Sequence, residues 1–245
     1  MKLLGLIGYP LGHSFSKAYF SNKFLKEGLS DYDYQLFPLK DISEFPALLN
    51  AFPNLKGLNV TIPYKEKVIP YLDELDESAE KIGAVNVIKL DNGKKTGYNS
   101  DYYGFRKSLQ DFLPQNFEGK ALVLGTGGAS KAINFALGTM ELPFQVVSRD
   151  STRGLSYQSL LNNPELLRHF HLIVNTTPLG TYPSVEEKPD LPYDRIGENH
   201  FLYDLVYNPE QTAFMKEGIA RNASVKNGYE MLVEQAEKAW EIWNE

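Results

Sequence analysis

Short apolar runs alternate with helical periodicity along the first hundred residues. Leu3–Ile7, Tyr32–Phe37 and Gly57–Thr61 have the spacing of strands, and Gly8 and Pro63 end two of them. Helices are predicted over Ser16–Glu27, after the capping box Asp41-Ile-Ser-Glu44, around Lys65–Tyr71 and over Glu77–Ile82. Two further strands, Ala84–Leu90 and Lys94–Tyr98, flank a turn with a strong hairpin signal, Asp91-Asn-Gly. The pattern predicts a complete α/β layer unit.

A second α/β pattern begins near Asp101. Strands are predicted at Ala121–Leu124, Phe144–Ser148, His171–Asn175 and Phe201–Leu205, and helices at Asp101–Phe112, Lys131–Thr139 and Gly228–Trp240. Strands that alternate with helices indicate a parallel sheet. The fold class is therefore α/β with two domains, residues 1–100 and 101–224. Periodicity alone leaves open which domain the final helix, within residues 225–245, packs against.

Composition excludes several classes of protein and site. The net charge of −6 argues against a nucleic-acid partner, although a small anion remains possible. The chain has no cysteine, which excludes disulfides and thiolate sites, and its four scattered histidines make a zinc site a poor interpretation. No window is long and apolar enough to span a membrane, and the apolar run at the start is too short for a signal peptide. We expect a cytoplasmic protein without a metal site.

A glycine-rich segment follows the first strand of the second pattern. Gly125-x-Gly127-x-x-Ser130 lies between a strand and a helix, where glycines let the backbone approach a phosphate at a helix N-terminus. The motif alone is weak, and a glycine-rich turn without a ligand is the alternative. Its strand and helix context favours a dinucleotide site that includes Gly128 and Ala129.

Charged residues after the next strand bear on which dinucleotide is bound. NAD enzymes usually carry an acidic residue near Ser148, whereas here Arg149 follows it and Arg153 lies close by. Guanidinium groups pair well with a 2′-phosphate, so the sequence favours NADP over NAD. Asp150 would repel that phosphate if it pointed inward, and both arginines could be ordinary surface residues.

Hydroxyl and amide side chains gather where strands of the first domain end. Ser14, Ser16, Thr61, Asn59 and Asn86 have this position, and together they suit a ligand with several hydroxyls, each of which needs a partner when buried. Each residue also has a simpler interpretation: either serine could cap a helix. Asn99 could be a turn residue, and Asp101 could be a helix cap.

Eight segments in this order make the chain similar to the shikimate dehydrogenase family over essentially its whole length. They are Gly8-Tyr-Pro-Leu-Gly-His-Ser-Phe-Ser16, Asn59-Val-Thr-Ile-Pro-Tyr-Lys65, Gly83-Ala-Val-Asn86, Gly97-Tyr-Asn-Ser-Asp101, Leu124-Gly-Thr-Gly-Gly-Ala-Ser130, Asn175-Thr-Thr-Pro-Leu-Gly180, Tyr203-Asp-Leu-Val-Tyr-Asn-Pro209 and Gly228-Tyr-Glu-Met-Leu-Val-Glu-Gln235. The chain departs from the family pattern at Lys17, Phe20, Ser100 and Asp150.

The resemblance implies reversible reduction of 3-dehydroshikimate to shikimate with NADPH, by an N-terminal substrate domain and a Rossmann-type NADP domain. It also implies that the C-terminal helix packs on the first domain. By matching positions it assigns the substrate to Ser14, Ser16, Asn59, Thr61, Asn86, Asp101, Tyr207 and Gln235. It places Thr176 in the cofactor site, with Gly228 and Met231 bordering the nicotinamide.

Lys65 and Asp101 are the candidates for catalysis. Carbonyl reduction needs a proton donor near the developing alkoxide; Lys65 can supply that proton, while Asp101 orients the ammonium and binds a substrate hydroxyl. The alternative interpretation is that Lys65 and Asp101 form an ordinary ion pair on the protein surface.

Two competing functions are open. One is a related dehydrogenase that prefers quinate, another hydroxy acid or NAD, and the other is a non-catalytic NADP-binding sensor. A sensor would be expected to lose Lys65 or Asp101, and both are present.

Overall fold

The computed structural model describes residues 1–12, 14–150, 152 and 154–245. They form two compact units, Met1–Gly104 with Val233–Glu245, and Phe105–Leu232. The unit boundaries therefore lie inside two helices, at 104/105 and 232/233, where the sequence analysis divided the chain at 100/101 and 224/225.

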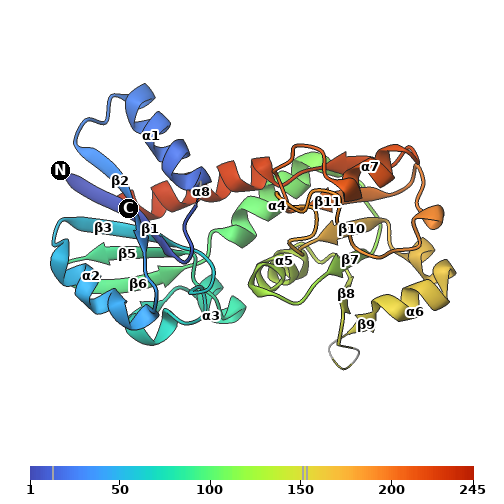
Figure 1. The fold of residues 1–245 in the computed structure, drawn as a ribbon, viewed down its shortest axis with the longest axis horizontal. Coiled ribbons are helices and arrows are strands. Elements are labelled where there is room, and N and C mark those ends of the chain that lie inside the picture. Colours follow the sequence, from blue (N-terminus) through green and yellow to red (C-terminus); the bar gives the residue numbers. More distant parts are fainter. Residues whose placement is uncertain (13, 151, 153) are drawn as a thin grey trace. The chain divides into compact units, whose positions relative to one another are not determined.

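The first unit is built on a six-stranded mixed sheet of order β2-β1-β3-β5-β6-β4 (Figure 1). Its elements are β1 (Lys2–Gly8), α1 (Phe15–Glu27), β2 (Tyr32–Pro38), η1 (Ile42–Glu44), α2 (Phe45–Ala51), β3 (Leu55–Val60), η2 (Ile69–Tyr71), β4 (Glu74–Leu75), α3 (Glu77–Ile82), β5 (Val87–Asp91), β6 (Lys94–Tyr98) and the parts of α4 (Asp101–Phe112) and α8 (Tyr229–Asn244) within its bounds. β1 is parallel to β2 and β3, whereas β5 is antiparallel to both β3 and β6.

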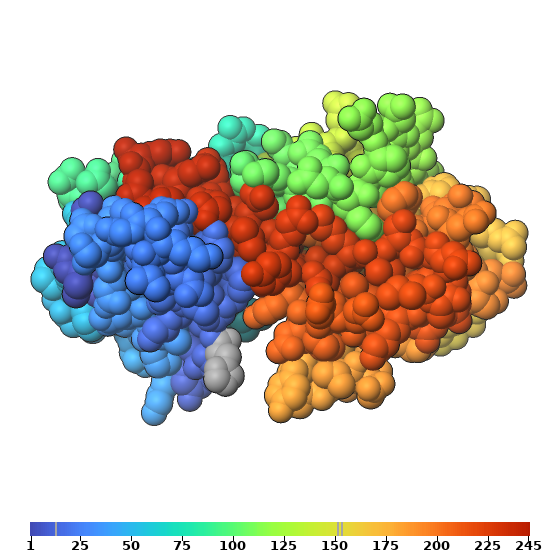
Figure 2. All heavy atoms as spheres, turned by 90° about the horizontal axis from the view of Figure 1, so that it is seen from above, coloured from blue at the N-terminus to red at the C-terminus, as the bar shows by residue number. Residues whose placement is uncertain are grey.

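Alternate residues of β1 supply the two faces of this sheet. Leu3 and Ile7 belong to the core under α2 and α3, while Leu4 and Leu6 pack with α1 and α8. The C-terminal helix is tied to α1 by an ion pair between Lys23 and Glu237 of 2.9 Å. Figure 2 shows this end of the chain, in red, against the blue N-terminal residues. The return of the last helix to the first unit is thus confirmed.

The second unit is a six-stranded parallel sheet of order β9-β8-β7-β10-β11-β12. Its elements are the rest of α4 and α8 with β7 (Ala121–Leu124), α5 (Gly128–Thr139), β8 (Phe144–Ser148), β9 (Leu155–Ser156), α6 (Tyr157–Asn162), η4 (Pro164–His169), β10 (Leu172–Asn175), η5 (Tyr193–Arg195), β11 (Phe201–Asp204), α7 (Ala213–Ile219) and β12 (Ser224–Lys226). Counted along the chain this order is 3-2-1-4-5-6, the order of Rossmann dinucleotide-binding folds.

One predicted helix is wrong. Residues 65–68 form turns, and only Ile69–Tyr71 is helical, as a single 3-10 turn. The carbonyl of Lys65 accepts a hydrogen bond from the Val85 amide at 2.7 Å. In the predicted helix it would instead accept one from the amide four residues later in the chain. Pro70 further lacks an N–H to donate.

Candidate active site

The topology of the first unit brings four chain segments to one edge of its sheet. β3 ends at this edge just after Asn59, and the segment that contains Lys65 follows. Because β5 is antiparallel to β3, it begins there, just after Asn86. β6 is antiparallel to β5 and ends there, where Asp101 starts α4. Residues far apart in sequence therefore converge through strand direction alone.

Lys65 and Asp101 form an ion pair at this edge. The Lys65 Nζ atom lies 2.6 Å from Asp101 Oδ2, and the two side chains are only 20% and 12% exposed. The Asp101 amide donates to Asn99 Oδ1 at 3.1 Å, which fixes the start of the helix. This partial burial argues against a plain surface pair, because solvent screens exposed pairs strongly.

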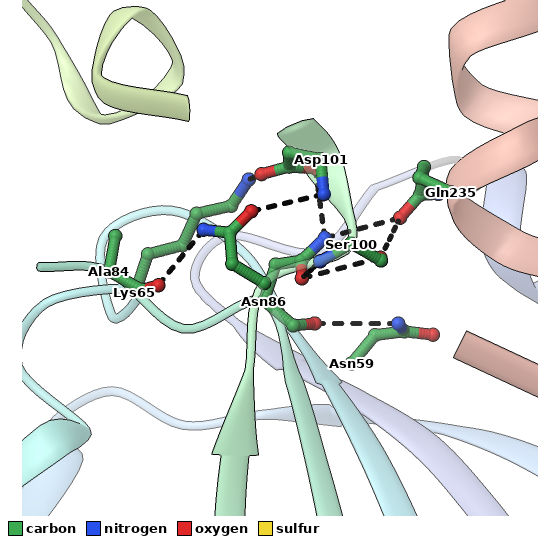
Figure 3. Close-up of polar contacts among 8 residues, drawn as sticks. Asn59, Lys65, Ala84, Asn86, Ser100, Asp101 and Gln235 are labelled. Atoms are coloured by element: carbon green, nitrogen blue, oxygen red, sulfur yellow. Dashed lines mark hydrogen bonds and ion pairs between the residues drawn. The ribbon is translucent and has the colours of Figure 1, made fainter. Parts of the chain in front are cut away.

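Asn86 connects the pair to a buried amide and hydroxyl network (Figure 3). Its Nδ2 atom donates to Asp101 Oδ1 at 2.9 Å and to Ser100 Oγ at 3.0 Å, and it lies 3.3 Å from Gln235 Oε1. Its Oδ1 atom accepts the Ser100 amide at 2.6 Å. Asp101 thus uses one carboxylate oxygen for Lys65 and the other for Asn86, which fixes the orientation of the carboxylate.

A second branch of the network reaches Ser16. The buried Tyr34 hydroxyl donates to Asn59 Oδ1 at 2.7 Å and also has a hydrogen bond with the Ser16 side chain. Burial raises the pKa of Tyr34, so its hydroxyl stays protonated as a donor. Asn59 Nδ2 in turn donates to the Asn86 carbonyl at 3.4 Å. The structure therefore brings together Ser16, Asn59, Lys65, Asn86, Asp101 and Gln235.

Two other predicted substrate residues, Ser14 and Thr61, have different contacts. Ser14 is the N-cap of α1, and its hydroxyl accepts the Lys17 amide at 3.3 Å, as the simpler interpretation of this residue had it. Thr61 follows β3, and a Cβ atom added at Gly8 would lie 2.4 Å from its methyl group. Gly8 therefore allows the chain after β3 to pass close to β1.

Sequence reasoning missed two members of the network, Tyr34 and Ser100. Tyr34 was seen only as part of an alternating strand, and the sole signal was a tyrosine at an inward position, since a buried tyrosine usually hydrogen-bonds through its hydroxyl. Ser100 was noted as a departure from the family but was not assigned to the site. Ser100 is fully buried, and its hydroxyl accepts a hydrogen bond from Asn86 Nδ2 at 3.0 Å, so it belongs to the network.

The glycine-rich segment of the second unit has the shape of a phosphate cradle. Gly125 has φ +110°, and a Cβ atom there would lie 2.9 Å from Thr176 Oγ1. Gly127 is the N-cap of α5 without a side-chain cap, and neither Gly127 nor Gly128 has a neighbour within 4 Å of an added Cβ. Ala129 follows in the first turn of the helix. An uncapped helix N-terminus facing open space suits a dinucleotide phosphate, so these residues fit the expected cofactor.

The predicted 2′-phosphate residues follow β8 in the next loop. Ser148 is buried and its hydroxyl accepts the Asp150 amide at 3.0 Å, while Arg149 is exposed. The Asp150 carboxylate accepts the amide and hydroxyl of Thr152 at 3.0 and 2.8 Å. Arg153 lies outside the described residues.

Three residues assigned by resemblance lie at the end of the second unit. Met231 is buried, Tyr207 is 37% exposed, and Gly228 packs directly on the backbone that follows β11. A Cβ atom at Gly228 would lie 2.1 Å from the Leu205 carbonyl oxygen. Packing against this backbone therefore requires a residue without a side chain at position 228, whether or not Gly228 also borders the cofactor.

Two other kinds of feature are absent from the described part of the chain. Within those ranges, His, Asp and Glu side chains form no group of three suited to hold a metal ion. No described helix has both the length and the apolar character needed to cross a bilayer.

Comparison with known proteins gives consistent results over the whole chain. Residues 6–88 match the model of the shikimate dehydrogenase substrate-binding domain. A shikimate dehydrogenase (NADP(+)) from Methanococcus maripaludis is 38% identical over 257 residues, which is 99% of this chain and 91% of that protein. The structure of shikimate 5-dehydrogenase from Thermus thermophilus in complex with NADP(H) and shikimate is 31% identical, with a TM-score of 0.87 over 99% of this chain and 93% of that one.

A relative of different specificity has the same fold. Quinate dehydrogenase from Corynebacterium glutamicum in complex with NAD is 28% identical, with a TM-score of 0.88 over 99% of this chain and 93% of that one. Backbone similarity therefore does not distinguish the two substrates or the two cofactors, and specificity must be argued from side chains.

Proposed function

Because this chain belongs to the shikimate dehydrogenase family, we propose that it reduces 3-dehydroshikimate reversibly to shikimate with NADPH, using Lys65 and Asp101. The enzyme is an NADP-dependent oxidoreductase that acts on a CH–OH group. The observation that carries the residue assignment is the 2.6 Å contact of Lys65 with Asp101 inside a network of buried amides and hydroxyls. Such a network offers both donors and acceptors to a substrate with several hydroxyls.

The two residues have distinct roles in the proposed mechanism. The bound cofactor supplies the hydride. Lys65 donates a proton to the substrate oxygen as negative charge develops there, and takes it back in the oxidation direction. Asp101 holds the ammonium in place and accepts a hydrogen bond from a substrate hydroxyl. Asn86 keeps the Asp101 carboxylate oriented, since it donates to the oxygen that Lys65 does not contact.

The remaining proposed assignments follow the sequence analysis. Ser14, Ser16, Asn59, Thr61, Asn86, Tyr207 and Gln235 bind the substrate. Gly125, Gly127, Gly128, Ala129, Ser148, Arg149, Arg153, Thr176, Gly228 and Met231 hold NADP. The open cradle at Gly127 and the exposed guanidinium of Arg149 support the second set.

Replacement of Lys65 tests the mechanism. Lys65→Ala should lower turnover by roughly 10²–10⁴, the usual contribution of a general acid or base. Binding of NADPH, measured by fluorescence titration, should change little. Lys67→Ala is the matched control, because Lys67 is an exposed lysine two residues away. Near-normal turnover in the Lys65 variant would refute the assignment.

Steady-state assays separate the proposed function from its alternatives. Shikimate and quinate are each offered with NADP and with NAD, and shikimate with NADP should give the highest kcat/KM. A higher value with quinate or NAD would identify the related dehydrogenase instead. The presence of the Lys65–Asp101 pair argues against a sensor, which would bind NADPH and turn over neither substrate.

We also expect the enzyme to act in the cytoplasm as a monomer or homodimer, with small molecules as its partners and without nucleic acid or membrane. Cell fractionation tests the location, and light scattering of the purified protein tests the oligomeric state.

A further inference from the structure

One carboxylate in the second unit is fully buried and joins several segments of the chain. Asp204, the last residue of β11, is 0% exposed. Its Oδ1 atom accepts hydrogen bonds from Asn175 Nδ2 at 2.9 Å and from the Val206 amide at 3.0 Å. Its Oδ2 atom accepts the Thr212 hydroxyl at 2.6 Å. Three donors from different positions therefore meet on one side chain.

These contacts fix two loops, the one after β10 and the one between β11 and α7, the latter at both of its ends. Asn175 Oδ1 accepts both the amide and the hydroxyl of Thr177, at 3.0 and 2.6 Å, which sets the course of the chain after β10. Val206 begins the segment after β11. The Thr212 hydroxyl also caps α7 by accepting the Met215 amide at 3.2 Å. Asp204 thus links the loop after β10, the loop after β11 and the start of α7.

The loop after β10 is in turn tied to the glycine cradle. The Thr176 hydroxyl donates to the Leu124 carbonyl at 2.6 Å, directly before Gly125. β7 and β10 are neighbours at the point where the strand order reverses, and in open α/β sheets ligands bind outside the carboxyl ends of the strands at this point. The loops that Asp204 holds therefore border the expected dinucleotide site.

A buried carboxylate is costly, so its presence calls for a reason. Burial raises the pKa of Asp204 to about 6, despite three hydrogen bonds that lower it. An apolar side chain of similar size would avoid that cost but would leave the Asn175, Val206 and Thr212 donors without this acceptor. A carboxylate suits the position because each oxygen accepts more than one hydrogen bond.

We propose that Asp204 is a positioning residue for the cofactor: through Asn175 it holds the loop after β10, which carries Thr176, in the conformation that receives NADP. The inference rests on the proposed function. Asp204 acts through Asn175, Val206 and Thr212, so it is not a catalytic residue. Substrate-binding groups of the first unit do not depend on it.

The test compares three variants by NADPH fluorescence titration and by steady-state kinetics. Asp204→Ala removes the acceptor, and Asp204→Asn keeps one oxygen and the side-chain shape. Tyr203→Phe is the matched control, because Tyr203 is the preceding buried residue of β11 and its hydroxyl donates to Ser108 Oγ at 2.8 Å, away from these loops. Thermal unfolding of each variant measures the accompanying loss of stability.

We expect Asp204→Ala to raise the NADPH Kd and the KM for NADP about tenfold or more, the effect of losing one buried hydrogen bond in the loops. Asp204→Asn should have a smaller effect in the same direction, and in both variants the KM for shikimate should change less than the KM for NADP. Tyr203→Phe should bind NADPH like the parent, even though it is less stable.

Three outcomes would overturn the inference. In the first, a folded Asp204 variant binds NADPH as tightly as the parent. In the second, Tyr203→Phe weakens NADPH binding as much as the Asp204 variants, which would show a general loss of stability. If Asp204→Ala does not fold, the same comparison of NADPH Kd values is made with Asp204→Asn. In the third, the parent itself binds no NADPH, and then the proposed function fails too; the first two outcomes leave that function intact.

Discussion

Neighbouring side chains of opposite charge after β8 have separate partners. Asp150 could repel a 2′-phosphate, but its carboxylate accepts the amide and hydroxyl of Thr152 and so belongs to its own loop. Arg149 is exposed, yet near enough to Tyr157 for its charge to lower the tyrosine's pKa slightly against the larger effect of burial. The exposed position of Arg149 suits a guanidinium that binds an anion.

Removal of the Arg149 charge should therefore reduce the preference for NADP. We expect Arg149→Ala to raise the KM for NADP by about ten- to a hundredfold, the worth of a charged hydrogen bond, with little change for NAD. Steady-state kinetics with both cofactors measures the ratio. Lys120→Ala, at an exposed position before β7 in the same unit, controls for a general loss of positive charge. An unchanged ratio in the arginine variant would exclude Arg149 from phosphate recognition.

Asp204 should also make stability depend on pH. Its folded pKa of about 6 lies above the ordinary 3.8, so its contribution to stability is fully present below pH 3.8 and is lost as the pH rises through about 6. The loss amounts to about 3 kcal/mol at most, from 1.36 kcal/mol per unit of pKa shift. Asp204→Asn lacks this loss, so the free energy of unfolding of the variant, taken relative to that of the parent, should rise from pH 4 to pH 7.

Urea unfolding of the parent and Asp204→Asn at several pH values measures that gain. Tyr203→Phe should follow the parent's pH dependence, since it leaves the carboxylate in place. A difference between Asp204→Asn and the parent that is the same at pH 4 and pH 7 would show that Asp204 keeps an ordinary pKa. Tyr193 is the titratable neighbour of Asp204, but its pKa is raised well above this pH window.

At the scale of elements, α8 begins at a close approach between two backbone segments. Gly228 immediately precedes the helix, and an added Cβ atom would lie 2.1 Å from the Leu205 carbonyl oxygen and 2.7 Å from the carbonyl carbon. These are backbone atoms of the segment after β11, so neither can move aside as a side chain could. The helix start and this segment therefore have to move together.

Gly228→Ala should destabilise the protein by about 1–3 kcal/mol, the usual cost of overpacking. Gly138→Ala is the control, because Gly138 lies in α5 and nothing is within 4 Å of an added Cβ. That substitution should be neutral or stabilise the helix by about 0.5–1 kcal/mol. Denaturant unfolding compares the two, and equal stability of both variants would show that the Leu205 contact yields readily.

Sequence analysis predicted correctly the elements that are marked by residues within or next to them, such as caps, turn residues and a regular apolar spacing. The bounds of α3 and α4 agree with the prediction, and the Asp91-Asn-Gly turn forms with Asn92 and Gly93 at positive φ. α5 starts earlier than predicted, at Gly128, because glycines at its start obscure the periodicity. The two- and three-residue strands β4, β9 and β12 and the short helices α6 and α7 were missed, since so few residues show no period.

Prediction of the candidate site depended on motifs more than on periodicity. Lys65, Asn86 and Asp101 lie in segments with a strong pattern, and the structure brings them into contact. Tyr34 belongs to the network through a strand that carries no motif, so only its burial beside Asn59 reveals it. Contacts between side chains of distant strands are set by register, which a single sequence does not show.

At the scale of the whole molecule, each unit has its own core, but the first unit is built from both ends of the chain. α8 contributes Ala236, Ala239, Ile242 and Trp243 to the core that it shares with α1 and β1. The Trp243 indole donates to the Ile88 carbonyl at 3.0 Å, and it lies where a side chain on Gly57 would be. Gly57 therefore leaves the space that this indole fills.

Trp243→Ala should destabilise the first unit by about 3–5 kcal/mol, because it leaves a large cavity and removes a buried hydrogen bond. Calorimetry should then show part of the protein unfolding at a lower temperature than the rest. Leu25→Ala, at an 81% exposed position of α1, should change stability by no more than about 0.5 kcal/mol. If the tryptophan variant unfolds like the parent, α8 does not hold the first unit together.

The contribution of α8 to the first unit also sets an order of events during synthesis. A ribosome releases Met1–Gly104 before Val233–Glu245, and until the latter emerge, only α1 covers the face of the sheet that α1 and α8 share. The residues of the second unit, Phe105–Leu232, are complete before then. A later segment thus completes the core of an earlier one, and a nascent chain exposes part of that apolar surface while Phe105–Leu232 are being made.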